Sequence, residues 1–208
     1  MVKRLIFDLD NTLILLKDKY RDGIKKTVEY YKLDINYIDV DDVIEDYENH
    51  YNFYSKENML KLINDKFNLN LGIDFIDMWL SELGNMGDYD KNVEETLKYL
   101  SNKYELVVLT NWFKDSQLDR LKHAKIDKYF KKVIGGDKYI KPNIEAYKEA
   151  MDNLEIEECI MIGDNYKVDL ETPINIGMKV IQVDLKDKIK EEKEYQVIKK
   201  ISELQDIL

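Results

Sequence analysis

Two aspartates two residues apart, Asp8 and Asp10, are the first side chains in this sequence whose type and spacing could do chemistry. They follow Leu5–Phe7, a short apolar run of the kind that forms a strand buried on both faces. Side chains two apart share a face of a strand, and ligands of open α/β sheets bind at the carboxyl ends of the strands. The run therefore predicts two carboxylates at the rim of a core, where a turning backbone would allow them different roles.

An Asp-x-Asp pair has two other interpretations that must be considered. The first is a strand followed by a solvated turn. The second is a calcium loop of the EF-hand type, with Asp8, Asp10 and Thr12 at its first, third and fifth positions. The second fails because Leu13 stands where such a loop needs glycine and Lys19 stands where it needs glutamate. The pair gains weight from three further pieces of sequence downstream.

The first two of these pieces could bind an anion. Thr110 and Asn111 end the apolar run Leu106–Leu109, and a threonine hydroxyl together with the N–H groups of a turn suits a phosphate. Lys141 and Pro142 precede an expected helix, so the lysine could bring a positive charge to the same edge of the sheet. Taken alone, each has an ordinary alternative: many strands end in Thr-Asn, and an exposed lysine is common in a lysine-rich chain.

The last piece adds acids. The apolar run Cys159–Ile162 ends in Gly163 and Asp164, and Asp169 follows five residues after Asp164 at the start of an expected helix. Asp164 would add a third carboxylate to the two at the end of the first strand, and three clustered acids need a cation. Hard oxygen ligands with few protein donors suit Mg²⁺, which keeps its waters and takes phosphate oxygens from a substrate.

The rest of the chain must place these strand ends side by side. From residue 90 onward strands alternate with helices, which predicts an α/β fold with a doubly wound parallel sheet. We expect strands at 5–7, 106–109, 132–135, 159–162, 179–183 and 195–198. We expect helices at 93–100, 115–124, 142–154 and 168–176, with Pro173 kinking or ending the last one, and a short helix after residue 198.

The stretch between the first strand and residue 90 has a different pattern. Apolar residues at a spacing of three to four predict helices near 18–31, 40–54, 56–67 and 75–82, with no convincing strand among them. We therefore expect residues 14–89 to form a helical cap domain. It would be inserted into a core domain that is made of residues 1–13 and 90–208.

Composition limits the classes of protein to consider. The chain of 208 residues is 44% hydrophobic and carries a net charge of −10, which favours a folded core and disfavours binding to nucleic acid or to an anionic membrane. Its apolar runs are too short to span a bilayer, and Asp8 comes too early for a signal peptide, so we expect a soluble cytoplasmic protein. The single cysteine, Cys159, excludes an internal disulfide, and its apolar neighbours predict a buried, inert thiol.

Together and in this order, the four pieces resemble the motifs of the haloacid dehalogenase-like (HAD) superfamily. Asp8-Leu9-Asp10-Asn11-Thr12 is similar to its first motif, Thr110 to its second and Lys141 to its third. Gly163-Asp164 through Asp169 is similar to the fourth. The helical insertion resembles the C1-type cap of the family. The resemblance covers about 1–13 and 90–185.

The resemblance implies a role for each motif residue. Asp8 would be the nucleophile that attacks phosphorus and forms an aspartyl-phosphate. Asp10 would be the general acid toward the leaving alkoxide and then the general base for the hydrolytic water. Mg²⁺ would be held by Asp8, by Asp164 and by Asp10 through its carbonyl. Lys141 would offset the crowded negative charge.

The resemblance also implies supporting residues. Thr110 and the N–H of Asn111 would bind phosphate oxygens. Thr12 would lie behind the residues that contact metal and substrate and would support them. Asp169 would position Lys141 or a metal-bound water. Pro173 departs from the small residue that relatives often have in this helix, and this departure touches no catalytic role.

Four residues of the expected cap are candidates for contacts with the rest of the substrate: Tyr20, Arg21, Tyr51 and Tyr54. The first two lie early in the cap, where relatives often place such contacts. The other two belong to an aromatic-rich stretch that could stack on a base or a sugar. The alternative for that stretch is ordinary packing of helix aromatics in a tyrosine-rich protein.

The sequence therefore predicts a Mg²⁺-dependent phosphomonoesterase that acts on a small phosphorylated metabolite through an aspartyl-phosphate. A sugar phosphomutase of the same superfamily has the same motifs and remains open. A metal-independent haloacid dehalogenase fits less well, because its position equivalent to Asp10 is not acidic. A non-catalytic regulatory protein would be expected to lose part of the acid set, and all of that set is present.

Overall fold

A sheet of six parallel strands forms the centre of the computed structural model, which describes residues 1–15, 19–37, 39–85, 89 and 91–208. The order across the sheet is β3-β2-β1-β4-β5-β6, and every neighbouring pair is parallel. The strands are β1 Arg4–Phe7, β2 Glu105–Leu109, β3 Lys132–Ile134, β4 Cys159–Gly163, β5 Lys179–Val183 and β6 Gln196–Ile198. The predicted parallel α/β fold is confirmed.

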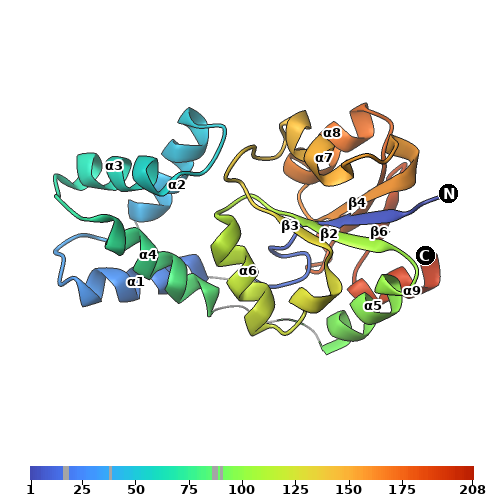
Figure 1. The fold of residues 1–208 in the computed structure, drawn as a ribbon, viewed down its shortest axis with the longest axis horizontal. Coiled ribbons are helices and arrows are strands. Elements are labelled where there is room, and N and C mark those ends of the chain that lie inside the picture. The colour runs from blue at the N-terminus through green and yellow to red at the C-terminus, as the bar shows by residue number, and fades with distance from the viewer. Residues whose placement is uncertain (16–18, 38, 86–88, 90) are drawn as a thin grey trace.

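Helices cover both faces of this sheet (Figure 1). One face carries α5 Lys91–Ser101, α6 Lys114–His123 and α9 Leu204–Ile207, and the other carries α7 Ile144–Met151 and α8 Glu171–Asn175. Short helical turns link them: η1 Asp127–Tyr129, η2 Ile156–Glu158, η3 Tyr166–Leu170 and η4 Ile201–Glu203. Side chains of β1 point alternately into the two cores, Leu5 and Phe7 into one and Ile6 into the other. No helix in the described ranges combines the length and apolar character that crossing a membrane requires.

The first strand occupies the point where the chain changes direction across the sheet. From β1 the chain moves outward through β2 to β3, and it then returns to the other side of β1 to form β4. In register, Phe7 lies opposite Val108 of β2 and Ile162 of β4. Because all three strands are parallel, the residues after them emerge at one edge, which is where doubly wound sheets bind ligands.

A block of helices lies beyond the carboxyl end of β1 (Figure 1). It contains α1 Lys19–Tyr30, α2 Asp39–His50, α3 Lys56–Phe67 and α4 Ile73–Gly84. These helices surround an apolar cluster of their own, in which Tyr47, Phe75 and Trp79 are fully buried. Two residues that follow β2, Trp112 and Phe113, also pack into this cluster, so it reaches the sheet. The limits of cap and core, 14–89 and 1–13 with 90–208, stay a prediction.

The second helix of this block ends earlier than the sequence pattern predicts. We expected it to continue to Tyr54, whereas α2 ends at His50. The chain then turns toward the sheet, because the N–H of Tyr54 donates to the carbonyl of Gly136 at 2.7 Å. The approach is close: a Cβ on Gly136 would come within 2.6 Å of the Tyr54 ring. A contact distant in sequence thus overrides the local helical periodicity.

The predicted helix 168–176 is replaced by two short elements. A π-helical turn, η3, spans Tyr166–Leu170, and α8 with Pro173 follows it. The side chain of Asn165 caps the turn by accepting the N–H groups of Lys167 and Val168. Such wide turns are rare and often occur at functional sites. This one brings Asp169 back toward the end of β4.

We expect the only cysteine to be chemically silent in the folded protein. Cys159 begins β4 and is fully buried, and burial raises the pKa of its thiol to about 11. At about pH 8 the thiol therefore stays protonated, and the thiolate is the reactive form. A colorimetric thiol reagent should label the native protein ~100-fold more slowly than protein unfolded in guanidinium chloride. Equal rates would contradict the burial of this strand.

Candidate active site

Three carboxylates gather at the edge of the sheet described above. Asp8 follows β1, Asp164 follows β4, and Asp169 lies in η3. One carboxylate oxygen from each of the three lies within 4.8 Å of those from the other two. The N–H of Asp8 donates to the carbonyl of Ile162 at 2.8 Å, so the strand pairing continues up to the first carboxylate and fixes its backbone.

A buried lysine sits between two of these acids. The ammonium nitrogen of Lys141 donates to Oδ1 of Asp8 at 2.6 Å and to Oδ1 of Asp169 at 2.7 Å. Burial opposes the charge of Lys141, but Asp169 and Asp8 outweigh this and raise its pKa. Burial also opposes the charge of Asp8 and so raises the pKa of its carboxyl, and Lys141 offsets part of that rise. The charges of this cluster therefore depend on one another.

Two features hold Lys141 and its partner in place. The side chain of Asn111 clamps the backbone of Lys141: its Oδ1 accepts the N–H at 2.7 Å, and its Nδ2 donates to the carbonyl at 2.9 Å. Asp169 accepts the N–H of Asn165 on its second oxygen, at 2.9 Å. A Cβ on Gly163 would lie 2.6 Å from the Cβ of Asp169, so only glycine allows this approach.

The donor set suits a hard divalent cation. Asp8 also accepts a hydrogen bond from the Thr12 hydroxyl, at 2.9 Å. Burial and the neighbouring charge of Asp169 raise the pKa of Asp164 to about 6, so a cation beside it would favour its charged form. Asp8 and Asp169 each have a hydrogen-bond partner on both oxygens, so these contacts do not decide between them, and Asp8 with Asp164 as side-chain ligands stays a prediction. Oxygen donors in this number and type fit Mg²⁺ with its waters.

The second aspartate of the first motif has different neighbours. Asp10 is directed to helix α6, where its Oδ2 accepts from Nε2 of Gln117 at 2.8 Å. Its Oδ1 forms an ion pair with the guanidinium of Arg120. The carboxylate of Asp10 therefore lies outside the acid cluster, in which Asp169 stands instead. The expected contact of Asp10 with a metal, through its carbonyl, stays a prediction.

The hydroxyl of Thr110 lies beside the same helix. Its Oγ1 accepts from Nε2 of Gln117 at 2.9 Å, and the N–H of Thr110 pairs with the carbonyl of Ile134 in β3. The predicted contacts of Thr110 and of the Asn111 N–H with phosphate stay predictions. The side chain of Asn111, however, has a role that the sequence pattern did not indicate, namely the clamp on Lys141.

The four candidate cap residues have different surroundings. The side chain of Tyr20 lies outside the described part, and Arg21 is exposed on α1. Tyr51 is half-buried and stacks on Tyr47 with ring centroids 4.6 Å apart. Tyr54 is buried and packs against Trp112, with ring centroids 5.2 Å apart. Contact of these residues with a substrate stays a prediction, and the burial of Tyr54 gives it a packing role as well.

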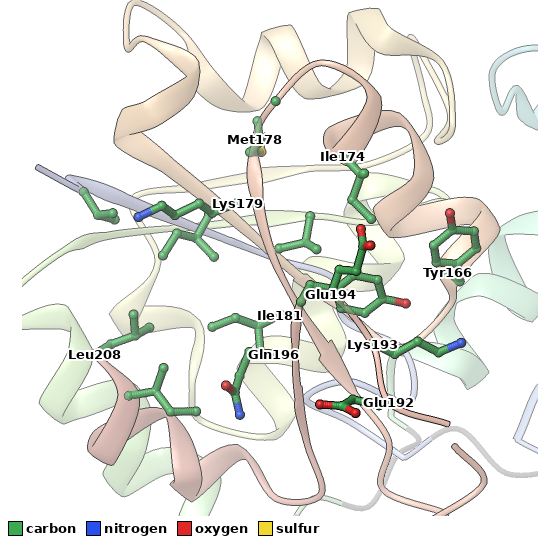
Figure 2. A pocket seen from close by; sticks show the side chains of 16 residues that line it. Tyr166, Ile174, Met178, Lys179, Ile181, Glu192, Lys193, Glu194, Gln196 and Leu208 are labelled. Atoms are coloured by element: carbon green, nitrogen blue, oxygen red, sulfur yellow. The ribbon is translucent and has the colours of Figure 1, made fainter. Parts of the chain in front are cut away.

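Two hollows lie along β5. One, of about 330 Å³, opens beside Asp164, and its lining includes Asn11, Lys186 and Lys188. Lys186 and Lys188 bring positive charge to this lining, which also contains Asp164 and Asp184. Figure 2 shows the other, of about 800 Å³, which is lined by residues such as Ile174, Met178, Lys193 and Leu208. Tyr166 lines both.

Sequence reasoning missed Gln117 and Arg120. Both are buried, and they lie three residues apart on α6, so they share one face of the helix. A polar pair at that spacing, a few residues after Thr110-Asn111, is the signal that could have drawn attention to them. Nothing in the sequence indicated which face of α6 would turn to the site.

Comparison with known proteins gives a consistent result. The model of the family described as haloacid dehalogenase-like hydrolase matches residues 5–183. The N-acylneuraminate-9-phosphatase of Rattus norvegicus is 24% identical over 199 residues, which cover 86% of this chain and 80% of that protein.

Solved structures show the same fold. A HAD-hydrolase from Bacillus subtilis bound to magnesium superposes with a TM-score of 0.75 at 16% identity, covering 99% of this chain and 98% of that one. A 2-haloacid dehalogenase from Pseudomonas syringae gives 0.72 at 16% identity, covering 100% and 98%. At such identities the likeness concerns the fold alone, and the side chains of the site must decide the chemistry.

Lys141→Met should be strongly destabilising, because it leaves two buried carboxylates without their cation. We expect the free energy of unfolding to fall by ~3–5 kcal/mol in urea at about pH 7 without added metal. The loss should grow from about pH 7 to about pH 9, because burial raises the pKa of Asp8 to about 8 and the loss of Lys141 raises it further, so charging this carboxyl above about pH 8 costs the variant more than the wild type.

Lys148→Met on α7 is the matched control for this substitution. Lys148 is exposed and pairs with Glu145 at the surface, so its loss should change stability by less than ~0.5 kcal/mol. If Lys141→Met were as harmless as Lys148→Met, the ion pairs of Lys141 would not stabilise the site.

Proposed function

The chain belongs to the haloacid dehalogenase-like hydrolase family, and on that premise we propose that it is a Mg²⁺-dependent phosphomonoesterase for a small phosphorylated metabolite. The observation that carries the proposal is the acid cluster at the end of β1. There Asp8 is held by Lys141 and Thr12, with Asp164 close by and Asp10 two residues along the chain. The match to a phosphatase over most of the chain supports it.

The reaction would proceed in two halves. An oxygen of Asp8 attacks phosphorus and the bond from phosphorus to the leaving oxygen breaks. Asp10 enters this half protonated and gives its proton to the leaving oxygen, and the proton that it takes from water in the second half restores it. In the second half Asp10 takes a proton from water, whose oxygen attacks the aspartyl-phosphate and frees phosphate and the Asp8 carboxylate. The two aspartates keep separate tasks because different side chains surround them.

Charge balance is the main task of the other residues. Lys141 would neutralise negative charge next to Asp8, while the Thr110 hydroxyl and the N–H of Asn111 would bind phosphoryl oxygens. Asp8, Asp164 and the carbonyl of Asp10 would hold Mg²⁺, which supplies positive charge to the phosphoryl group when it is bound. Asp169 and Thr12 would hold Lys141 and Asp8 in orientation.

The acid set argues against a dehalogenase, whereas it fits a sugar phosphomutase as well as a phosphatase. A dehalogenase needs no acid at the position of Asp10, yet Asp10 is present and has two dedicated partners in α6. A sugar phosphomutase needs the same set, and it differs in passing the phosphoryl group to a sugar rather than to water. Release of inorganic phosphate therefore separates the proposed activity from that alternative.

The substrate should be small and anionic. The rat relative is named for a phosphorylated sugar acid, which makes phosphates of sugars and sugar acids the first class to test. Lys186 and Lys188 beside the site suit such ligands. The helical block beyond β1 would select the leaving group, with Tyr20, Arg21, Tyr51 and Tyr54 as candidate contacts.

A panel of phosphorylated metabolites, assayed for phosphate release with Mg²⁺, tests this function. We expect turnover of at least one sugar phosphate by the wild type. Asp8→Asn should lower kcat at least ~1000-fold, because an amide oxygen is a poor nucleophile toward phosphorus. Asp187→Asn, an exposed aspartate paired with surface lysines, is the control and should be fully active. A well-folded Asp8→Asn protein with substantial activity would remove Asp8 from the proposed role.

Metal removal gives an independent test. Activity should vanish in excess EDTA and return with Mg²⁺, since the phosphoryl group would otherwise face uncompensated carboxylates. Ca²⁺ should not restore it, because its larger and looser coordination lets it bind Asp8 through both oxygens. Full release of phosphate in excess EDTA would contradict the metal assignment.

A further inference from the structure

The buried face of helix α6 carries two polar side chains that the reaction scheme above does not use. Gln117 is fully buried and Arg120 is 2% exposed. A guanidinium is costly to bury unless it is paired, so the structure must give it partners. Its partners are Asp10, which is the general acid and base of the proposed reaction, and Gln117.

The contacts form one closed network. Nη1 of Arg120 pairs with Oδ1 of Asp10 and donates to Oε1 of Gln117 at 2.8 Å. Nε2 of Gln117 donates to Oδ2 of Asp10 at 2.8 Å and to Oγ1 of Thr110 at 2.9 Å. Each oxygen of Asp10 therefore has its own donor, and two fixed points determine both the position and the plane of the carboxyl group.

The helix that carries this pair is itself firmly held. Leu121 of α6 is buried in the core between α5 and the sheet. On another side the hydroxyl of Ser116 donates to the carbonyl of Leu80 in α4, at 3.2 Å. Groups that must hold a reacting side chain within a fraction of an ångström work best on such rigid elements.

We propose that Gln117 and Arg120 are positioning residues for Asp10, and that they hold its carboxyl group where it exchanges a proton with the leaving oxygen. The proposal rests on the proposed phosphatase function. Asp10 is 18% exposed on its side chain, so part of that side chain is open to a ligand while its two oxygens keep their partners. By the same contact Gln117 occupies an acceptor site of Thr110, whose hydroxyl donates to the carbonyl of Asn111 at 3.4 Å and would turn to a phosphoryl oxygen when substrate binds.

The basicity of the leaving group gives a readout specific to this role. An alkoxide leaves only with a proton, whereas p-nitrophenolate leaves without one. The kinetic constant to compare is kcat/KM, because it covers the steps up to the aspartyl-phosphate and excludes its hydrolysis. Arg120→Met should lower kcat/KM by ~100-fold for the best primary alkyl phosphate of the panel and by less than ~5-fold for p-nitrophenyl phosphate.

Three further variants make the experiment decisive. Lys122→Met removes a positive charge from the exposed side of α6 and should leave both values unchanged. In an Asp10→Asn background, Arg120→Met should add nothing to the loss for the alkyl phosphate, because the side chain that it positions is gone. Arg120→Lys keeps the charge with a smaller disturbance of packing. It should show the same substrate dependence with a smaller loss, so the test survives if the methionine variant does not fold.

A crystal structure of Arg120→Met, or of Arg120→Lys, gives a readout that needs no activity. The Asp10 side chain should leave the position that it has in the wild type. If it keeps that position, or if both substrates slow equally in a folded variant, Arg120 does not position Asp10. A rise in kcat/KM would mean that the pair restrains Asp10, and this too would overturn the proposal. If the wild type releases no phosphate from any substrate, the proposed function fails instead, and the crystal structure still decides the positioning role.

Discussion

The ion pairs of Lys141 with Asp8 and Asp169 are the interaction on which the rest of this site depends. A buried ammonium is stable only between anions, and two buried carboxylates are stable only beside a cation. The pairs therefore fix three segments that are far apart in sequence: the end of β1, the loop before α7 and the turn η3. Gly163 and the Asn111 clamp serve this same arrangement, because they allow the approach of Asp169 and hold the backbone of Lys141.

The sheet order explains why these segments meet. β1 stands between β2 and β4, and the chain crosses to opposite sides of it, so the ends of three parallel strands open onto one edge. Each strand is short and almost fully buried, and a polar group at its end is therefore delivered to a defined place. The helical block closes on this edge through Tyr54 and Trp112, which join its apolar cluster to the loop after β2.

Sequence reasoning found the strand ends because their signal is local. An apolar run that stops at Asp8, Thr110 or Asp164 can be read in a few residues, and alternation of strands and helices then gives the sheet. What it missed depends on distant contacts. The end of α2 at His50 follows from the bond between Tyr54 and Gly136, and the clamp of Asn111 on Lys141 joins residues 30 apart. The partners of Asp10 depend on which face of α6 turns inward, and periodicity alone leaves that open.

The two aspartates of the first motif show how one strand end can supply two different groups. Asp8 faces Lys141 and Thr12 in a buried cluster that has room for a metal ion, so its oxygens stay close to positive charge. Asp10 turns the other way and is held by amide and guanidinium donors from α6, apart from that cluster. Had both side chains faced the same partners, they would compete for one cation and repel each other. The turn after β1 separates them, and in the proposed reaction this separation would let one act on phosphorus while the other handles protons.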